Sequence, residues 1–148
     1  AARFPTPRLD IQRTTRALRR PSVAAMGWPP RVGELLPRAE EALGVREKLA
    51  TYSLALDHHR GGSKAKGFKV VLGISMASID HLEAEIRTGI LKAPVTTARK
   101  NPPYGVNCVV EFPIRGVGER SEVFAQLRAV WLVRREVPPR LVSAYLKP

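Results

Sequence analysis

The residues best suited to chemistry lie together at 57–64, which run Asp-His-His-Arg-Gly-Gly-Ser-Lys. Glycine has no side chain, so the amides of the double glycine could approach a ligand closely. Ser63 is a good N-cap, and the pattern predicts a helix over residues 63–72 that ends at Gly73. An imidazole, an ammonium group and free amides would then meet at a helix N-terminus, where phosphate binds readily. The simpler interpretation is a loop followed by a capped helix with no ligand.

These residue types would suit the cleavage of RNA by its own ribose 2′-hydroxyl. That reaction needs a base for the hydroxyl, an acid for the leaving oxygen and cations for the phosphate charge, and it needs no metal or cofactor. Histidine titrates near neutral pH and can serve as acid or base. The candidate catalytic residues are His58, Lys64, Ser143 and Tyr145, and the candidate nucleic-acid contacts are His59, Gly61, Gly62, Arg99, Lys100 and Arg128.

Spacing argues against several better-known sites. The Gly-Gly-Ser-Lys run lacks the spacing of a nucleotide-binding phosphate loop. The chain has no His-Glu-x-x-His pair and no Gly-x-Ser-x-Gly elbow, which argues against a zinc protease and a serine hydrolase. Its histidines are spread too thinly for a structural zinc site, and we expect Cys108 to be a buried thiol rather than a nucleophile. No apolar run approaches the roughly 20 residues that a membrane span needs.

The chain of 148 residues is strongly basic, with 25 Lys and Arg against 13 Asp and Glu, a net charge of +12. This balance favours a polyanionic partner, most often nucleic acid, although a soluble domain can carry a basic surface without using it. Hydrophobic residues make up 44%, which is enough for one ordinary domain with its own core.

Residues 1–33 differ from the rest, because arginines and prolines dominate and Asp10 is the lone acid among the first 20. We expect a basic arm that could follow a phosphate backbone, serve as an organelle transit segment or act only as a linker. Trp28 within it could stack on a base or join a small local cluster. Residues 34–148 are expected to form a single domain.

Hydrophobic spacing predicts helices in the first half of that domain. Residues 34–50 carry an apolar stripe that ends near Gly44 and is followed by a further turn. The clearest helix spans residues 76–92, with Ser78 as its cap. Its apolar stripe consists of Ile79, Leu82, Ile86 and Ile90. His81 lies off that stripe, and we expect it to be solvated at the surface.

The second half changes to the alternating pattern of strands. A polar loop is expected at 95–105, and Pro138-Pro139 should break the chain before the last strand. The strands are expected at 106–114, 122–134 and 140–146. In the last of them Leu141, Ser143 and Tyr145 would share one face. Helices followed by an antiparallel meander predict an α+β fold, with N-terminal helices packed on a small antiparallel β-sheet.

Two stretches resemble a small bacterial domain family without an established function. One is Tyr52-x-Leu54, then Asp57-His58-x-x-Gly61-Gly62-x-Lys64-Ala65, Phe68 and Leu72-Gly73-Ile74. The other is Val130-Trp131-Leu132 with Pro139-Arg140-Leu141-Val142-Ser143-Ala144-Tyr145. The resemblance covers about residues 50–146, and the family usually has proline where this chain has His59.

The chain is also similar to the C-terminal toxin domains of polymorphic and contact-dependent toxin systems, in the Barnase–EndoU–colicin–RelE group of ribonucleases. The resemblance implies metal-independent cleavage of RNA, often tRNA, in the cytoplasm of a target or host cell, and an immunity protein or antitoxin as partner. It places His58 on the family's histidine, Lys64 on its lysine and Ser143 on a serine or threonine near the chain end. Two alternatives stay open: a non-catalytic RNA- or ribosome-binding protein, and a structural component of a larger assembly.

Overall fold

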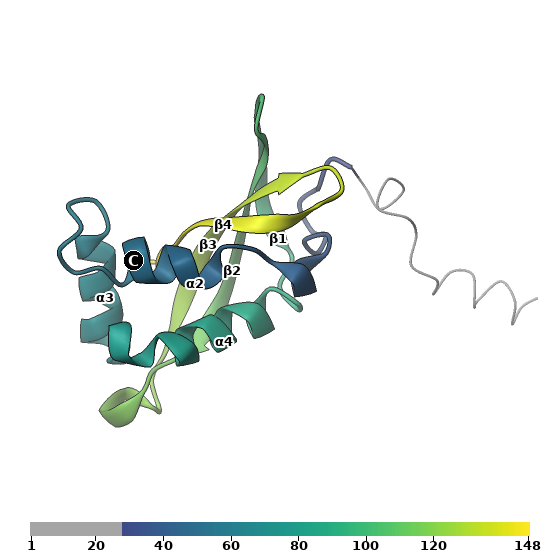
Figure 1. The fold of residues 1–148 in the computed structure, drawn as a ribbon. Helices are drawn as coiled ribbons and strands as arrows, with labels where there is room; N and C mark the ends of the chain where they lie inside the picture. Colours follow the sequence, from purple (N-terminus) through teal and green to yellow (C-terminus); the bar gives the residue numbers. More distant parts are fainter. Residues whose placement is uncertain (1–27) are drawn as a thin grey trace, which may run out of the picture.

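The computed structural model describes residues 28–148, in which helices come first and strands second (Figure 1). The helical elements are η1 (Ala39–Glu41), α2 (Val45–Lys48), the π-helical turn η2 (Leu49–Ser53), α3 (Gly62–Leu72), η3 (Met76–Ser78) and α4 (Ile79–Gly89). The strands are β1 (Val95–Asn101), β2 (Gly105–Arg115), β3 (Phe124–Arg134) and β4 (Val137–Leu146), with η4 (Gly118–Arg120) between β2 and β3. The prediction of an α+β fold with helices before the sheet is confirmed.

The strands form one antiparallel sheet in the order β1-β2-β3-β4. Side chains alternate between its faces. Cys108 and Trp131 are paired across β2 and β3 and are fully buried with helical side chains in the core, on what we call the helix face. Glu111 and Arg128 are paired on the other side and are only half-buried, and we call this the open face. Burial raises the pKa of the Cys108 thiol to about 11, which agrees with the predicted unreactive cysteine.

Two helical segments lie side by side across the helix face: α2 with η2, and α4 (Figure 1). The apolar stripe of α4 is buried as predicted. Gly89 at its end lies against β2, because a Cβ there would collide with the ring of Phe112. α3 lies at one end of this layer and contacts β4. The helix face and these helices therefore share one core.

The helix predicted over residues 34–50 is wrong in its first half. Gly44, with a left-handed φ of 71°, precedes α2 as its N-cap instead of ending a helix. Just before it, the Leu43 N–H donates to the Pro139 carbonyl (2.8 Å), and the Leu43 carbonyl accepts from the Leu141 N–H (3.0 Å). These bonds cover part of the outer edge of β4, which would otherwise be unpaired. A long-range contact therefore overrides the local helical pattern.

The loop predicted at 95–105 is mostly β1, in which Ala98 pairs with Cys108 and Arg99 pairs with Asn107. Only Val95 of this strand is buried. An edge strand with one buried residue has no hydrophobic alternation to detect, which is why the pattern failed here.

The proline pair 138–139 was expected to break the chain, but it lies inside β4. The turn comes earlier, at Glu136, whose φ is 61°. Because β4 is at the edge of the sheet, its prolines need not donate to a neighbouring strand on that side.

A bulge in β4 separates residues that were predicted to share a face. Val130 pairs with Ser143, but the adjacent Trp131 pairs with Leu141, so one residue of β4 is skipped. Leu141 therefore falls on the helix face and is buried, whereas Ser143 falls on the open face. The alternation of the last strand changes phase at this point, contrary to the prediction.

His81 is not the solvated histidine that we expected, because it is half-buried and its Nε2 lies 2.7 Å from the Arg115 carbonyl oxygen. The Arg115 N–H also donates to Glu85 in 2.6 Å. α4 thus holds the end of β2.

Ser78 was expected to cap α4, but it caps no backbone amide of that helix. Its hydroxyl accepts from the Ser75 N–H instead (3.0 Å).

The basic arm predicted at 1–33 lies mostly outside the described residues, which begin at Trp28. Its last part runs beside β1, where the Gly33 N–H donates to the Val95 carbonyl (2.8 Å). Between residues 28 and 148, none of the helices has the length and apolar character that a membrane crossing requires.

Candidate functional site

Lys64 is held between two tyrosines that come from different elements. Its Nζ lies 4.8 Å from the ring centroid of Tyr52 in η2 and 4.8 Å from that of Tyr145 in β4. It also donates a hydrogen bond of 3.2 Å to the Tyr52 hydroxyl. Cation–π contacts of this length are attractive, so they restrict where the ammonium group can move. Two predicted catalytic residues, Lys64 and Tyr145, are therefore in direct contact.

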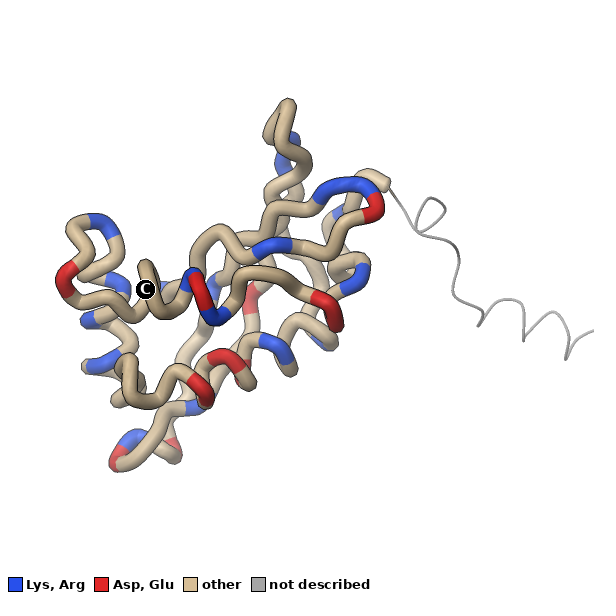
Figure 2. Tube along the Cα trace, in the orientation of Figure 1, with Lys and Arg blue, Asp and Glu red and all other residues tan. Residues whose placement is uncertain are grey.

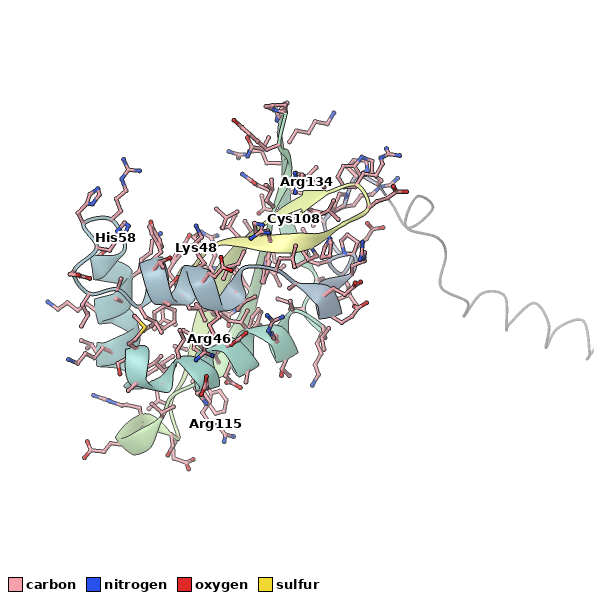
Figure 3. All side chains as sticks on the ribbon, viewed as in Figure 1. Arg46, Lys48, His58, Cys108, Arg115 and Arg134 are labelled. Atoms are coloured by element: carbon pink, nitrogen blue, oxygen red, sulfur yellow. The ribbon has the colours of Figure 1, made fainter. Side chains whose placement is uncertain are left out.

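His58 lies in the loop before α3 (Figure 3), and its ring contacts that of Tyr52. The two rings meet edge to face, with centroids 4.8 Å apart. His58 Nδ1 accepts from the N–H groups of Arg60 (3.0 Å) and Gly61 (2.9 Å). A neutral imidazole that accepts at Nδ1 carries its proton on Nε2. The group that His58 can offer to a ligand in this geometry is therefore the Nε2–H.

His59 stacks on His58, with ring centroids 5.3 Å apart and planes 4° from parallel. Its side chain is exposed, and within residues 28–148 it has no hydrogen-bond partner. The two histidines therefore differ in what they can do: the ring of His58 is oriented by the loop, whereas both ring nitrogens of His59 can exchange protons with solvent or a ligand.

The glycine amides that were expected to bind a phosphate are instead hydrogen-bonded within the same loop. The Gly61 N–H donates to His58 Nδ1, and the Gly62 N–H donates to the His58 carbonyl (2.7 Å). A Cβ on Gly61 would collide with the Tyr52 carbonyl oxygen, and a Cβ on Gly62 would lie 2.8 Å from that of Leu56. The glycines thus let the loop pack closely against the η2 segment. Contrary to the prediction, α3 begins at Gly62, with Gly61 and not Ser63 at its N-cap.

From Tyr145 the site continues across the open face. Arg128 pairs with Tyr145 in the sheet, and its Nε donates to Glu111 in 2.7 Å. Lys147 donates to the other carboxylate oxygen of Glu111 in 3.1 Å. Hydrogen bonding to Tyr145, and then to Glu111, raises the pKa of Arg128. Burial opposes the ionisation of Glu111, but hydrogen bonds from Lys147 and Arg128 outweigh it and lower its pKa.

Ser143, the remaining catalytic candidate, lies on the open face two positions before Tyr145. Side chains two apart on one strand face are about 7 Å apart. Among the described residues, its hydroxyl has no hydrogen-bond partner, so it is not hydrogen-bonded to Lys64 or His58. Ser143 is therefore next to the site and on the same face as Tyr145, but not part of the contact chain from His58 through Tyr52 and Lys64.

Arg99 and Lys100 are not brought to this site. They belong to β1, whereas β4 is the opposite edge of the sheet, three strand spacings or about 14 Å away. Arg99 pairs with Asn107 on the open face, whereas Lys100 pairs with Val106 on the helix face.

Figure 2 shows basic positions along α3 and at the β3–β4 turn, so the positive charge has more than one centre.

Sequence reasoning assigned no role to three residues of the site, namely Tyr52, Glu111 and Lys147. Opposed polar positions on β2 and β3 could have suggested that Glu111 meets Arg128. No local pattern could have placed Tyr52 over Lys64, because that contact depends on how η2 packs against α3 and β4. In the region 28–148, no group of three or more His, Cys, Asp or Glu side chains is arranged to hold a metal ion.

Residues 35–148 match the family DUF6883, a domain of unknown function. The match covers most of the chain, so the chain belongs to this family. Comparison with curated proteins and with solved structures found no match.

Proposed function

We propose that this DUF6883 domain is a metal-independent ribonuclease that acts through the site around Lys64. The observation that carries the proposal is the ammonium group of Lys64, which is clamped between the rings of Tyr52 and Tyr145. Tyr52 in turn contacts His58, and Tyr145 is hydrogen-bonded to Arg128. A fixed cation beside hydrogen-bond donors suits a phosphate whose charge grows during reaction. The net charge of +12 supports a polyanionic substrate.

In the proposed reaction, the 2′-oxygen of a ribose attacks the adjacent phosphorus. An O2′–P bond forms and the P–O5′ bond breaks, which leaves a 2′,3′-cyclic phosphate and a free 5′-hydroxyl. The 2′-hydroxyl gives its proton to His59, whose exposed ring can act as the base. The leaving 5′-oxygen takes a proton from the Lys64 ammonium group. Solvent then restores both side chains to their starting protonation states.

The other residues stabilise the phosphate in this scheme. His58 donates from Nε2 to a phosphate oxygen, because its Nδ1 is occupied inside the loop. Arg128, on the open face, offsets part of the negative charge of the phosphate. The hydroxyls of Tyr145 and Ser143 position the substrate. In this scheme His59 and Lys64 transfer protons, whereas His58 and Arg128 stabilise the charge of the phosphate.

A second candidate function is RNA binding without cleavage. It is favoured by the hydrogen bonds within the loop, which use the Nδ1 of His58 and the amides of Gly61 and Gly62. These groups stabilise the loop itself, so they are not available to a substrate. In that case the basic surface would hold RNA while the loop only shapes the site.

A His58→Asn variant separates these functions, because the Asn side-chain oxygen can replace Nδ1 as acceptor while the Nε2–H is lost. The purified chain is incubated with tRNA and total RNA in EDTA, and 2′,3′-cyclic phosphate ends are measured. We expect wild type to cleave, and His58→Asn to bind RNA and cleave on the order of 100-fold more slowly. Salt-sensitive binding of RNA that stays intact with wild type would favour the second function. If wild type neither cleaves nor binds RNA, both proposals are wrong.

The resemblance to toxin domains leads us to propose a cellular role as a toxin that is neutralised by an immunity protein or antitoxin. Induced expression of the chain in a bacterial host should arrest growth, and a Lys64→Met variant expressed at the same level should not. Unchanged growth with an enzyme that cleaves RNA in vitro would refute the toxin role and leave the ribonuclease proposal in place.

A further inference from the structure

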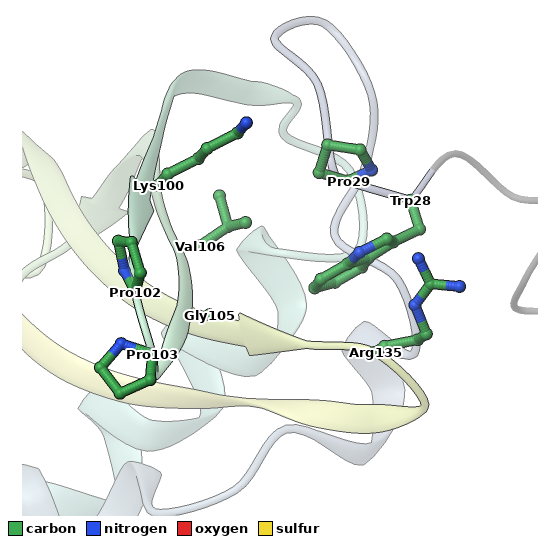
Figure 4. A pocket seen from close by; sticks show the side chains of 8 residues that line it. All are labelled: Trp28, Pro29, Lys100, Pro102, Pro103, Gly105, Val106 and Arg135. Atoms are coloured by element: carbon green, nitrogen blue, oxygen red, sulfur yellow. The ribbon is translucent and has the colours of Figure 1, made fainter.

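A hollow of about 460 Å³ lies at the end of the sheet where the β1–β2 and β3–β4 turns meet the segment after residue 27 (Figure 4). Its lining consists of Trp28, Pro29, Lys100, Pro102, Pro103, Gly105, Val106 and Arg135. We call it the Trp28 pocket. Arg135 follows β3, and the rise of about 3.4 Å per strand residue puts it about 24 Å from Arg128 along the strand. The pocket is therefore separate from the Lys64 site.

The aromatic wall of the pocket is held in place by backbone and core contacts. Trp28 is half-buried and packs against the hydrophobic core, and Pro30 after it is buried. The segment is tied to β1 by hydrogen bonds from the Gly33 N–H to the Val95 carbonyl and from the Val95 N–H to the Glu34 carbonyl, each 2.8 Å long. The indole therefore belongs to the folded domain and can serve as a fixed surface for a ligand.

One lining residue of the pocket, Gly105, has to be a glycine. Gly105 has a φ of 144°, and a Cβ there would collide with the Val133 carbonyl oxygen. A residue with a side chain would both strain this turn and disturb β3. The absence of a side chain at Gly105 thus leaves space in the hollow beside Val106, which adds an apolar surface to the lining.

Both charged residues that line the pocket are positive. Lys100 and Arg135 line it, and none of its lining residues is acidic. Neither cation has an ion-pair partner among the described residues. The Arg135 guanidinium carbon lies 5.5 Å from the centroid of the Trp28 ring, and Lys100 lies across the hollow from that ring (Figure 4). An aromatic surface with one cation over its ring and another across the hollow, neither of them in an ion pair, is complementary to a ligand that is flat at one end and anionic at the other.

We propose that the Trp28 pocket binds a nucleotide of single-stranded RNA, with the base against the Trp28 indole and the flanking phosphate between Lys100 and Arg135. Stacking on an aromatic side chain tolerates any base, and cations nearby hold the backbone. The volume lies in the range of about 300–1,000 Å³ that is usual for small-ligand sites. This inference rests on the proposed function for the identity of the polymer, and it adds a second contact point far from the Lys64 site.

Intrinsic fluorescence gives a direct assay, because the chain has two tryptophans and Trp131 is fully buried. Trp28 is therefore the tryptophan that a ligand can quench. The probes are a 2′-O-methyl hexaadenylate, which has no 2′-hydroxyl to attack, and adenosine 5′-monophosphate and ribose 5-phosphate. We expect quenching by the oligonucleotide and by the monophosphate, but not by ribose 5-phosphate.

Variants then test the residues. Lys100→Ala with Arg135→Ala should weaken binding of the hexaadenylate at least tenfold and reduce its salt dependence. The matched control, Lys69→Ala with Lys92→Ala, removes two exposed charges elsewhere and should bind within twofold of wild type. Trp28→Phe should abolish the quenching and leave the affinity, measured by anisotropy of a labelled oligonucleotide, within threefold.

Three results would overturn the proposal: no quenching by the hexaadenylate, equal quenching by ribose 5-phosphate, or equal weakening in the control variant. Competition by a synthetic peptide of residues 1–27 that blocks all nucleotide binding at equimolar concentration would also overturn it, because the pocket would then belong to the chain's own arm. Since the hexaadenylate cannot be cleaved, the outcome is independent of catalysis. RNA cleavage without quenching would refute the pocket alone, and quenching without cleavage would refute the ribonuclease alone.

Discussion

Replacing Lys64 by methionine is the most direct test of the site, because methionine keeps most of the side-chain length and removes the charge. The structure gives Lys64 two cation–π contacts and one hydrogen bond. Each cation–π contact is worth about 0.5–1 kcal/mol and the hydrogen bond about 0.5–1.5 kcal/mol, so their loss costs roughly 1.5–3.5 kcal/mol.

Two effects offset part of this loss. Methionine sulfur on an aromatic ring contributes about 0.3–1.5 kcal/mol. Removal of a cation from the first turn of α3, where it opposes the helix dipole, contributes about 0.3–1 kcal/mol. The net expectation is a decrease of about 1 kcal/mol in the free energy of unfolding, which leaves the chain folded.

The effect on catalysis should be much larger than the effect on stability. Loss of the group that protonates the leaving 5′-oxygen lowers the rate on the order of 10²–10⁴-fold. Urea unfolding followed by circular dichroism gives the stability, and the formation of cyclic phosphate ends gives the rate. The matched control is Lys66→Met, which makes the same change at an exposed position of the same helix and should alter neither quantity.

The reasoning would be refuted if Lys64→Met cleaved RNA within twofold of wild type, since the clamped cation would then have no part in the reaction. It would also be refuted if the variant were more stable than wild type by more than about 1 kcal/mol, because no combination of the contributions above predicts such a gain.

Two substitutions and one labelling experiment test the fold around the site. Gly89→Ala should destabilise the domain by about 1–3 kcal/mol, because its Cβ would collide with Phe112, whereas helix propensity alone predicts stabilisation; urea unfolding decides the sign, and Phe112→Leu should restore part of the loss. Glu111→Gln tests the pH dependence. The pKa of Glu111 is lowered in the folded protein, so its ionised form stabilises the fold above the ordinary value of 4.5, and this contribution is lost as the pH falls through the folded pKa. The variant should therefore have a lower Tm at neutral pH and a smaller further fall on acidification, and parallel Tm curves would contradict this. Cys108, with a pKa raised to about 11, should resist iodoacetamide in the native protein and react only after unfolding in urea, as measured by mass spectrometry. Fast labelling of the native protein would show that the core is open.

Local patterns were reliable where one side of an element is buried along its whole length. The stripe of α4 and the alternation of β2 and β3 were predicted correctly because each buried position recurs at the period of its element. The same reasoning missed β1, which buries one residue, and misjudged the first half of the helix at 34–50, where Leu43 bonds to β4 instead. Edge strands and edge-covering segments take their structure from distant partners, so their own residues carry little signal.

The composition and periodicity of this chain were sufficient to predict a basic α+β domain with helices before an antiparallel sheet, because these properties sum over many residues and depend on local burial. Tertiary structure alone decided what the motif at residues 57–64 can do. Packing placed Lys64 between Tyr52 and Tyr145, and loop closure directed His58 Nδ1 and the glycine amides inward. The bulge in β4 separated Ser143 from Leu141. Each of these features depends on atoms that are distant in sequence or on the closure of one loop, and no periodicity records them.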